Sequence, residues 1–301
     1  MRLNKKFEYL IFISVIFAFA YYFQKNSSYI YNLEFNFVFL FFVITIHSLK
    51  FLTQSLINFY LYRNVEIALS LSESIQMTIM NSLGNSLGPL KLGLGVKIAY
   101  LNKKHSLKVT KFVEINAQYG AFYFFGSTLI FLFILLIFQN DYIMEITLIT
   151  IIFVVLGLLS RNLVKVFSKY LETRDDNNFI VKFFRIINLK SIKKYKISLS
   201  VLSLIQLFLS FSLIFLIFQF LFLENTFLDS VYINFISQIS SLISLTPGNV
   251  GVLEIILVFF KDLYSMSAND VILLSLITRF SNLLSILLIN TSLNLIEKIK
   301  N

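Results

Sequence analysis

The chain has 301 residues, of which 57% are hydrophobic and only 14% are charged. An ordinary soluble domain has about 25% charged residues, so this composition excludes one and predicts a chain embedded in a lipid bilayer. With no cysteine and two histidines that form no zinc motif, the sequence predicts neither disulfides nor a metal, and no cofactor is expected. The net charge of +10 flanks apolar runs instead of forming a basic domain, which argues against nucleic acid as a partner.

Long apolar runs predict an all-α polytopic membrane protein with six crossings. The first run follows Arg2, Lys5 and Lys6, and it is either a cleaved signal peptide or an uncleaved span. The span is favoured, because everything downstream is also hydrophobic and cleavage would break the charge pattern described next. The six runs are Leu10–Phe23, Phe35–Tyr62, Phe112–Phe138, Met144–Leu159, Leu199–Leu223 and Val271–Leu293.

Basic residues in the connections predict the orientation of these runs. Seven Lys and Arg residues occur in Arg63–Lys111 and ten in Arg161–Lys196. The turns around Asp141 and across Glu224–Asp229 contain none. Cytoplasmic connections carry the excess of basic residues, so both basic stretches and both termini are expected inside. Neither connection is long enough for a typical catalytic domain, and a single integral membrane domain over residues 1–301 is expected.

Two further segments, Leu69–Ala99 and Val231–Phe260, are apolar but interrupted, and they hold the only two prolines, Pro89 and Pro247. Proline removes an amide donor and ends a helix, while the glycine four residues later tolerates a bend. Irregular backbone at membrane depth must be buried in protein or face water. Both segments are therefore predicted to be broken, re-entrant segments.

The broken segments share the pattern S-L-x-P-x-x-[LV]-G, at Ser86–Gly93 and Ser244–Gly251. In the predicted topology each copy follows two crossings and precedes one, and the two halves begin on opposite sides of the membrane. This arrangement is typical of an inverted repeat, with halves of about residues 1–140 and 141–301. Polar residues recur at helical spacing before each proline, and they either line a cavity or merely join helices. They are Thr78, Asn81 and Asn85 in the first segment, and Asn234, Ser237, Ser241 and Ser244 in the second.

Charged residues inside the apolar segments are the candidate functional residues, because charge in lipid is costly and usually pairs or lines a pathway. Glu254 lies seven residues after Pro247, and Arg279 lies in the last run. They form either a polar site, with Arg279 available for phosphate, or a structural ion pair. Lys97 follows Pro89 by eight residues and occupies a similar position in the first broken segment.

Both histidines have simple alternatives to a functional role. His47 and Lys50 lie in the middle of an apolar run, where they mark a pathway unless a tilted helix lets Lys50 reach an interface. His105 lies among Lys103, Lys104 and Lys108 and is expected to be a solvated loop residue. The chain contains no G-x-S-x-G, P-loop or Rossmann pattern, so we do not expect an enzyme.

The stretch Ser244–Glu254, followed by Arg279 in the context LITRF, resembles the C-terminal motif of the lysylphosphatidylglycerol synthase transmembrane region, or flippase-like domain. That motif has the form Pro-x-Gly-x-Gly-x-x-Glu with a later Arg, and Pro247, Gly251, Glu254 and Arg279 match it. The resemblance covers nearly the whole chain in length and segment order.

A second family motif, Gly-[Asp/Glu]-x-x-Arg-x-x-x-Leu, is only partly matched. It resembles Gly93–Leu101, but Leu94 stands where an acidic residue is usual, and Lys97 stands near the usual Arg. The C-terminal motif is therefore the more specific of the two.

The resemblance implies an inner-membrane protein that moves or handles lipids. One hypothesis is a flippase or transporter of a phospholipid or glycolipid, and the alternative is a membrane-embedded partner or enzyme of glycolipid or cell-envelope polysaccharide synthesis, beside a glycosyltransferase. The soluble aminoacyltransferase domain of the synthases does not follow the last run, so lipid aminoacylation by this chain alone is not expected. The residues expected to contact an anionic or phosphate-bearing lipid are Asn85, Pro89, Gly93, Lys97, Pro247, Gly248, Asn249, Gly251, Glu254 and Arg279.

Overall fold

The computed structural model describes residues 37–87, 92–138, 194–221, 223, 226–243, 249, 252–264 and 266–300. Within these ranges the secondary structure is helical and no strand occurs, so the all-α prediction is confirmed there. The predicted runs Leu10–Phe23 and Met144–Leu159 lie outside the described residues. The helices are α3 (Phe37–Arg63), α4 (Leu71–Leu87), α5 (Leu92–His105), α6 (Val109–Phe138), α9 (Lys196–Phe220), α10 (Phe227–Ile243), α11 (Val252–Phe259), the 3-10 turn η4 (Lys261–Tyr264) and α12 (Ala268–Lys300).

Four long helices, α3, α6, α9 and α12, are apolar and long enough to cross a membrane. They coincide with four of the six predicted runs, and the protein is therefore a membrane protein. Large apolar side chains such as Phe37, Phe133 and Ile197 are exposed on their outer faces. Exposed apolar surface of this extent is costly in water but suits contact with lipid acyl chains.

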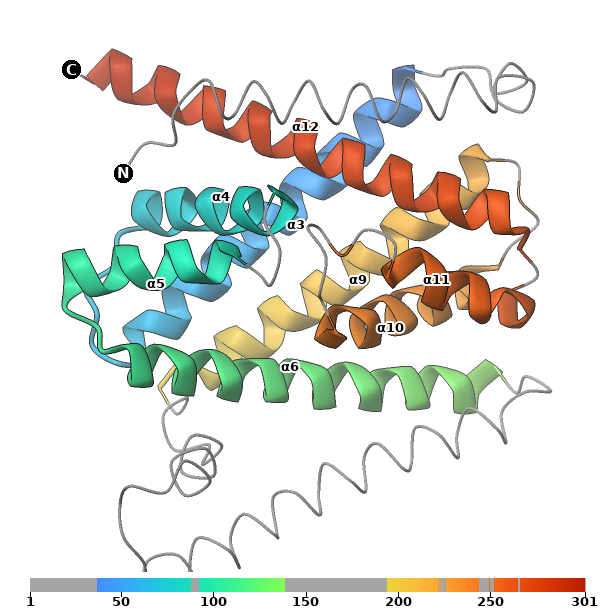
Figure 1. The fold of residues 1–301 in the computed structure, drawn as a ribbon, viewed down its shortest axis with the longest axis horizontal. Coiled ribbons are helices and arrows are strands. Elements are labelled where there is room, and N and C mark those ends of the chain that lie inside the picture. Colours follow the sequence, from blue (N-terminus) through green and yellow to red (C-terminus); the bar gives the residue numbers. More distant parts are fainter. Residues whose placement is uncertain are drawn as a thin grey trace, which may run out of the picture.

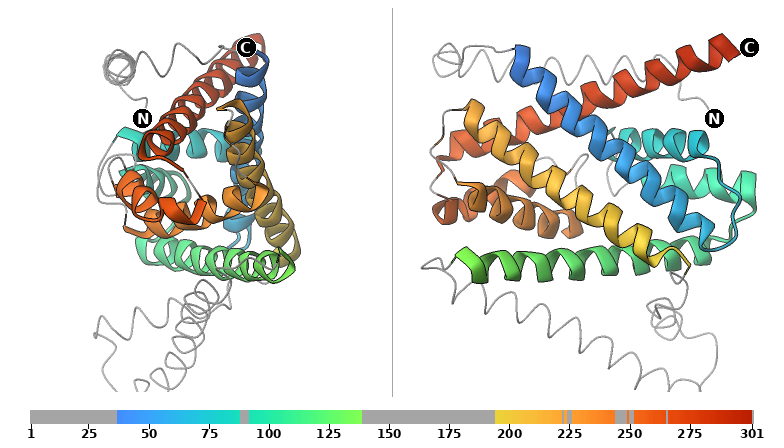
Figure 2. Two further views of the ribbon diagram at one scale, coloured as in Figure 1. Left: turned by 90° about the vertical axis from the view of Figure 1, so that its right-hand side faces the viewer. Right: turned by 180° about the vertical axis from the view of Figure 1, so that it is seen from behind.

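Two pairs of shorter helices lie between the long ones. The partners α4 and α5 lie side by side, as do α10 and α11 (Figure 1), so each broken segment folds as a helical hairpin. The α4–α5 hairpin points inward from one end of the molecule and the α10–α11 hairpin from the other, with their inner ends facing the middle (Figures 1 and 2). The helices α4 and α10 end at Leu87 and Ile243, before the two prolines, as expected for a residue that cannot continue a helix.

Each hairpin starts with the same local device, a capping box, in which a side chain and a backbone amide satisfy each other across the first helical turn. At α4, the Ser70 amide donates to Glu73 Oε2 at 2.9 Å and the Glu73 amide donates to Ser70 Oγ at 3.2 Å. At α10, the Thr226 amide donates to Asp229 Oδ2 at 2.7 Å and the Asp229 amide donates to Thr226 Oγ1 at 3.3 Å. The spacing S/T-x-x-D/E therefore sets where both hairpins begin.

The α4–α5 hairpin is held together by glycine contacts. A Cβ built on Gly84 would lie 2.6 Å from the Gly93 Cα, and one built on Gly93 would overlap the backbone oxygen of Asn81. The Gly93 amide also donates to Asn85 Oδ1 at 3.0 Å. Only glycine permits this close approach, which fixes the position of α5 against α4.

The main apolar core lies around the second hairpin. It joins α6, α9, α10, α11 and α12, and it contains the stacked rings of Phe131 and Phe235, whose centroids are 4.2 Å apart. A smaller core, around Tyr62, Leu101 and Phe112, joins the ends of α3 and α5 to the start of α6. Each hairpin is thus packed against long helices rather than exposed to lipid on all sides.

Candidate functional site

Glu254 in α11 and Arg279 in α12 form the ion pair expected from the sequence. Arg279 Nη1 lies 2.8 Å from Glu254 Oε1, and the two side chains are 22% and 16% exposed, respectively. The hydroxyl of Ser275 also donates to Glu254 Oε1. The guanidinium and carboxylate are largely withdrawn from solvent. In such a position each charge is stabilised by the other, and removing one of the two strongly destabilises the protein.

Asn249 connects this ion pair to the second hairpin. Its backbone oxygen accepts a hydrogen bond from Arg279 Nη2 at 3.3 Å, and its Nδ2 donates to Ser240 Oγ in α10 at 2.7 Å. Its backbone has a φ of 58°, a left-handed conformation that asparagine adopts more easily than most residues. The side-chain Oδ1 of Asn249 is buried without a hydrogen-bond partner. Asn249, which lies between α10 and α11 in the chain, is therefore attached to both α10 and α12.

Lys97 in α5 is buried, with 4% of its surface exposed. Its Nζ donates to Asn58 Oδ1 in α3 at 2.8 Å, and Asn58 Nδ2 donates to Thr78 Oγ1 in α4 at 2.9 Å. The amine also lies 5.1 Å and 5.9 Å from the ring centroids of Tyr62 and Phe112, within cation–π distance. Across the described ranges, no carboxylate lies within ion-pair distance of this amine, so its partners are an amide and two aromatic rings.

Comparison with known proteins identifies a family for this chain. Residues 7–289 match the family model of the lysylphosphatidylglycerol synthase TM region. The chain belongs to this family. A search of curated proteins found no match, and neither did a search of solved structures.

In this member of the lysylphosphatidylglycerol synthase TM region family, the predicted contact residues lie in two clusters. Glu254, Arg279 and Asn249 gather between α11 and α12, whereas Lys97 lies in the other hairpin with α3 and α6 around it. Asn85 and Gly93 bond to each other between α4 and α5. No hydrogen bond or ion pair joins the two clusters within the described ranges. The remaining predicted residues, Pro89, Pro247, Gly248 and Gly251, lie outside the described residues.

The side chain of His105 is only 15% exposed, so the prediction of a solvated loop residue is wrong. It lies at the end of α5 with its Nε2 3.7 Å from Glu73 Oε1, the carboxylate to which Lys104 Nζ pairs and the Tyr100 hydroxyl donates at 3.4 Å. These four residues, Glu73, Tyr100, Lys104 and His105, form a clasp that closes the outer end of the α4–α5 hairpin. The capping position of Glu73 brings its carboxylate to the end of α5, which local sequence spacing does not reveal.

One cation, Lys104, and one neutral residue, Ser70, decide the protonation of Glu73. Burial raises the pKa of the Glu73 carboxyl, but its bonds with Lys104 and with Ser70 outweigh burial and lower the pKa from 4.5 to about 2. The hydrogen bond with the Glu73 carboxylate raises the pKa of Lys104 in turn. The pair of Glu73 and Lys104 within the clasp is therefore ionised at neutral pH.

Residues important to these contacts were missed by the sequence reasoning. Asn58 is the direct partner of Lys97, yet in its apolar run only His47 and Lys50 were candidates for function. Gln238 accepts from Ser127 Oγ at 2.8 Å and donates to Asn234 Oδ1 at 2.7 Å, which links α6 to α10. An amide side chain inside an apolar run was the available signal in both cases, because such a group needs a partner away from water.

Proposed function

We propose that this protein is a lipid transporter of the inner membrane, and that it moves a phospholipid or glycolipid at a site between the inner ends of its two hairpins. The observation that carries the proposal is the ion pair of Glu254 and Arg279, together with the hydrogen bond from Arg279 to the broken hairpin. Charged groups at membrane depth are expensive and usually serve a substrate or ion pathway. A phosphate-bearing lipid offers the planar guanidinium a partner that can bind two of its donors.

The arrangement of helices supports an inverted repeat, with one half ending at α6 and the other containing α9 to α12. In each half a long helix precedes a hairpin and another long helix follows it. The hairpins point inward from opposite ends (Figure 1), and each begins with a capping box, at Ser70 and at Thr226. In transporters built from inverted repeats, broken helices meet near the midplane and expose backbone groups to the substrate.

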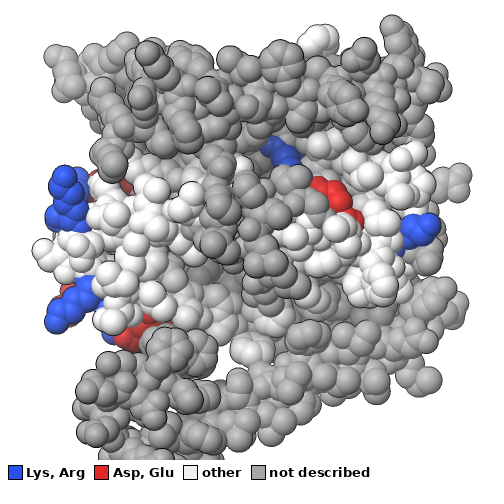
Figure 3. Space-filling model, viewed as in Figure 1, with Lys and Arg blue, Asp and Glu red and all other residues white. Residues whose placement is uncertain are grey.

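Charge supports an orientation in which the outer end of the α4–α5 hairpin faces the cytoplasm. Most charged side chains visible in Figure 3 gather at that end, over the ends of α3 and α5 and the start of α6. From the positive-inside tendency we propose that both termini lie inside and that the outer end of the α10–α11 hairpin lies outside. We propose this topology for the whole chain, including the two predicted runs beyond the described residues.

The test compares three variants in liposomes containing a headgroup-labelled phospholipid: Glu254→Gln, Arg279→Gln and the double variant. Removing one partner of a buried pair typically costs about 3–5 kcal/mol, whereas removing both can be nearly neutral, so only the double variant is expected to be as abundant as wild type. If the charges serve the substrate, that abundant protein translocates no lipid.

Recovery of both abundance and transport in the double variant would make the pair structural and overturn the proposed site. The exposed Lys103, at the end of α5, provides a matched control, because Lys103→Gln removes a charge without disturbing either cluster. A wild-type protein that translocates no phospholipid or glycolipid would overturn the transporter itself, leaving a role beside a glycosyltransferase.

A further inference from the structure

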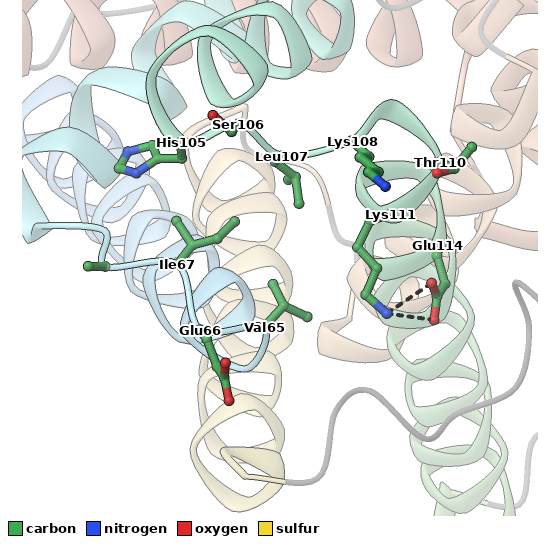
Figure 4. A pocket seen from close by; sticks show the side chains of 11 residues that line it. Val65, Glu66, Ile67, His105, Ser106, Leu107, Lys108, Thr110, Lys111 and Glu114 are labelled. Atoms are coloured by element: carbon green, nitrogen blue, oxygen red, sulfur yellow. Dashed lines mark hydrogen bonds and ion pairs between the residues drawn. The ribbon is translucent and has the colours of Figure 1, made fainter.

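A hollow of about 620 Å³ opens at the charged end of the molecule, away from the ion pair of Glu254 and Arg279. Its walls are the connection between α3 and α4, the connection between α5 and α6, and the first turns of α6 (Figure 4). Small-molecule sites in proteins commonly have volumes of about 300–1,000 Å³. The hollow is therefore large enough for a lipid headgroup.

The lining of the hollow divides into an apolar part and a polar part. Val65, Ile67 and Leu107 contribute apolar surface, and Ile67 and Leu107 belong to the small core under the hollow. Thr110, in the first turn of α6, contributes a hydroxyl, and Lys108, directly before α6, contributes an ammonium group. A lining of this kind favours an amphiphile over a free inorganic ion, because an ion gains nothing from the apolar part.

Lys108 is the cation available to a ligand in this hollow. Lys111 is engaged by Glu114, whose two oxygens lie 3.1 Å and 3.0 Å from Lys111 Nζ. Lys108 is exposed, and in the described part of the chain no hydrogen bond or ion pair engages it. The side chain of Glu66 points away from the loop that holds Ser106 and Leu107 (Figure 4). An anion entering the hollow thus meets an unpaired ammonium group.

The shape of the hollow is set by unusual backbone conformations. Glu66 has a φ of 62° and Ser106 a φ of 54°, so each of the two connections contains a non-glycine residue in the left-handed region. Such residues cost free energy and persist only where the surrounding structure holds them. Both connections are held, since the Leu69 amide donates to Ile67 O at 2.8 Å and Asn102 Nδ2 donates to Leu107 O at 3.0 Å.

We infer that this hollow binds the headgroup of an anionic phospholipid at the membrane surface, with Lys108 contacting the phosphate and the apolar lining contacting the glycerol backbone. The helices α3 and α6, which both cross the membrane, end and begin at the hollow, so the hollow lies where lipid headgroups are. This second site is independent of the proposed transport and requires no movement of the lipid across the bilayer.

The experiment measures binding of the first phosphatidylglycerol molecule to the delipidated full-length protein in neutral detergent, with phosphatidylcholine as the zwitterionic comparison. Lys108→Gln is expected to weaken phosphatidylglycerol binding roughly tenfold, the effect of losing one hydrogen bond to a charged group, and Lys108→Arg to restore most of it. Lys103→Gln is the matched control. Lys103 is also an exposed lysine at this end of the molecule, but it does not line the hollow, so its replacement should change binding less than about twofold.

Four results would overturn the inference. Equal weakening by Lys103→Gln would mean a diffuse attraction to the charged end, and no weakening by Lys108→Gln would remove the site. Competition by inorganic phosphate at the concentration of the lipid would mean that the hollow takes a free anion instead of a lipid. Loss of binding in Arg279→Gln, with no loss in Lys108→Gln, would place the lipid at the ion pair and so support the proposed transport site while refuting this one.

Discussion

Replacing Gly93 with alanine should break the packing of the α4–α5 hairpin. The added Cβ would overlap the backbone oxygen of Asn81 and lie 2.7 Å from Asn85 Oδ1, so the two helices must separate. Overpacking of this kind costs about 1–3 kcal/mol, and the contact with rigid backbone puts the cost at the upper end. Loss of the bond from the Gly93 amide to Asn85 adds about 1 kcal/mol. Alanine's better helix propensity offsets about 1 kcal/mol, which leaves a net loss of about 3 kcal/mol.

Gly95 provides the matched control on the same helix. A Cβ at Gly95 would meet no atom within 4 Å, so Gly95→Ala should gain about 1 kcal/mol from helix propensity alone. Thermal unfolding of the detergent-solubilised protein should then show a Tm lower by about 6–12 °C for Gly93→Ala and slightly higher for Gly95→Ala. A Gly93→Ala protein as stable as wild type would refute the close approach of α4 and α5 on which this reasoning rests.

Three further predictions concern the first hairpin and the topology. Lys97→Met removes a buried amine but leaves Asn58 Oδ1 unpaired, so the free energy of unfolding in detergent should change by less than about 2 kcal/mol. Lipid transport should nevertheless fall at least tenfold. Unchanged transport would exclude Lys97 from the site. Because the folded-state pKa of Glu73 is lowered to about 2, its clasp with Lys104 stabilises the protein above pH 4.5 and loses this contribution as the pH falls toward 2; Glu73→Gln should therefore be less stable than wild type at pH 6 and approach it near pH 2, and a difference that persists at low pH would contradict the ionised clasp. Cysteines introduced into this cysteine-free chain at Lys103 and Thr226 should react with membrane-impermeant reagents from opposite sides, Lys103→Cys from the cytoplasm, and labelling of both from one side would refute the topology.

The long helices were the part of the fold that the sequence could predict. An apolar run of more than about 20 residues has few stable alternatives to a membrane span, and four such runs were found where expected. The ion pair of Glu254 and Arg279 was predictable for a related reason, because two opposite charges in neighbouring apolar segments lower their cost by meeting.

Contacts between distant helices were beyond the reach of the sequence pattern. Asn58 meets Lys97 across 39 positions of the chain, and helical periodicity says nothing about which faces of two helices come together. The prediction that His105 is solvated failed for the same reason, because its burial depends on the folding of α5 back along α4. The hollow beside Lys108 is likewise made by two connections that only the tertiary fold brings together.

The short length of α11 has a consequence for the chemistry of Arg279. Its eight residues rise only about 12 Å, so within a hydrocarbon layer about 30 Å thick one end of the helix lacks water to hydrate its backbone. Its outward side chains, Ile255 and Phe259, are 71% and 79% exposed and suit contact with acyl chains, which offer a carbonyl no donor. Arg279 donates to the carbonyl oxygen of Asn249, three residues before α11, and pairs with Glu254 at the same time. A guanidinium has five N–H donors, and under the proposed function those left after these two contacts would bind the lipid phosphate, with the guanidinium already held in position by the protein.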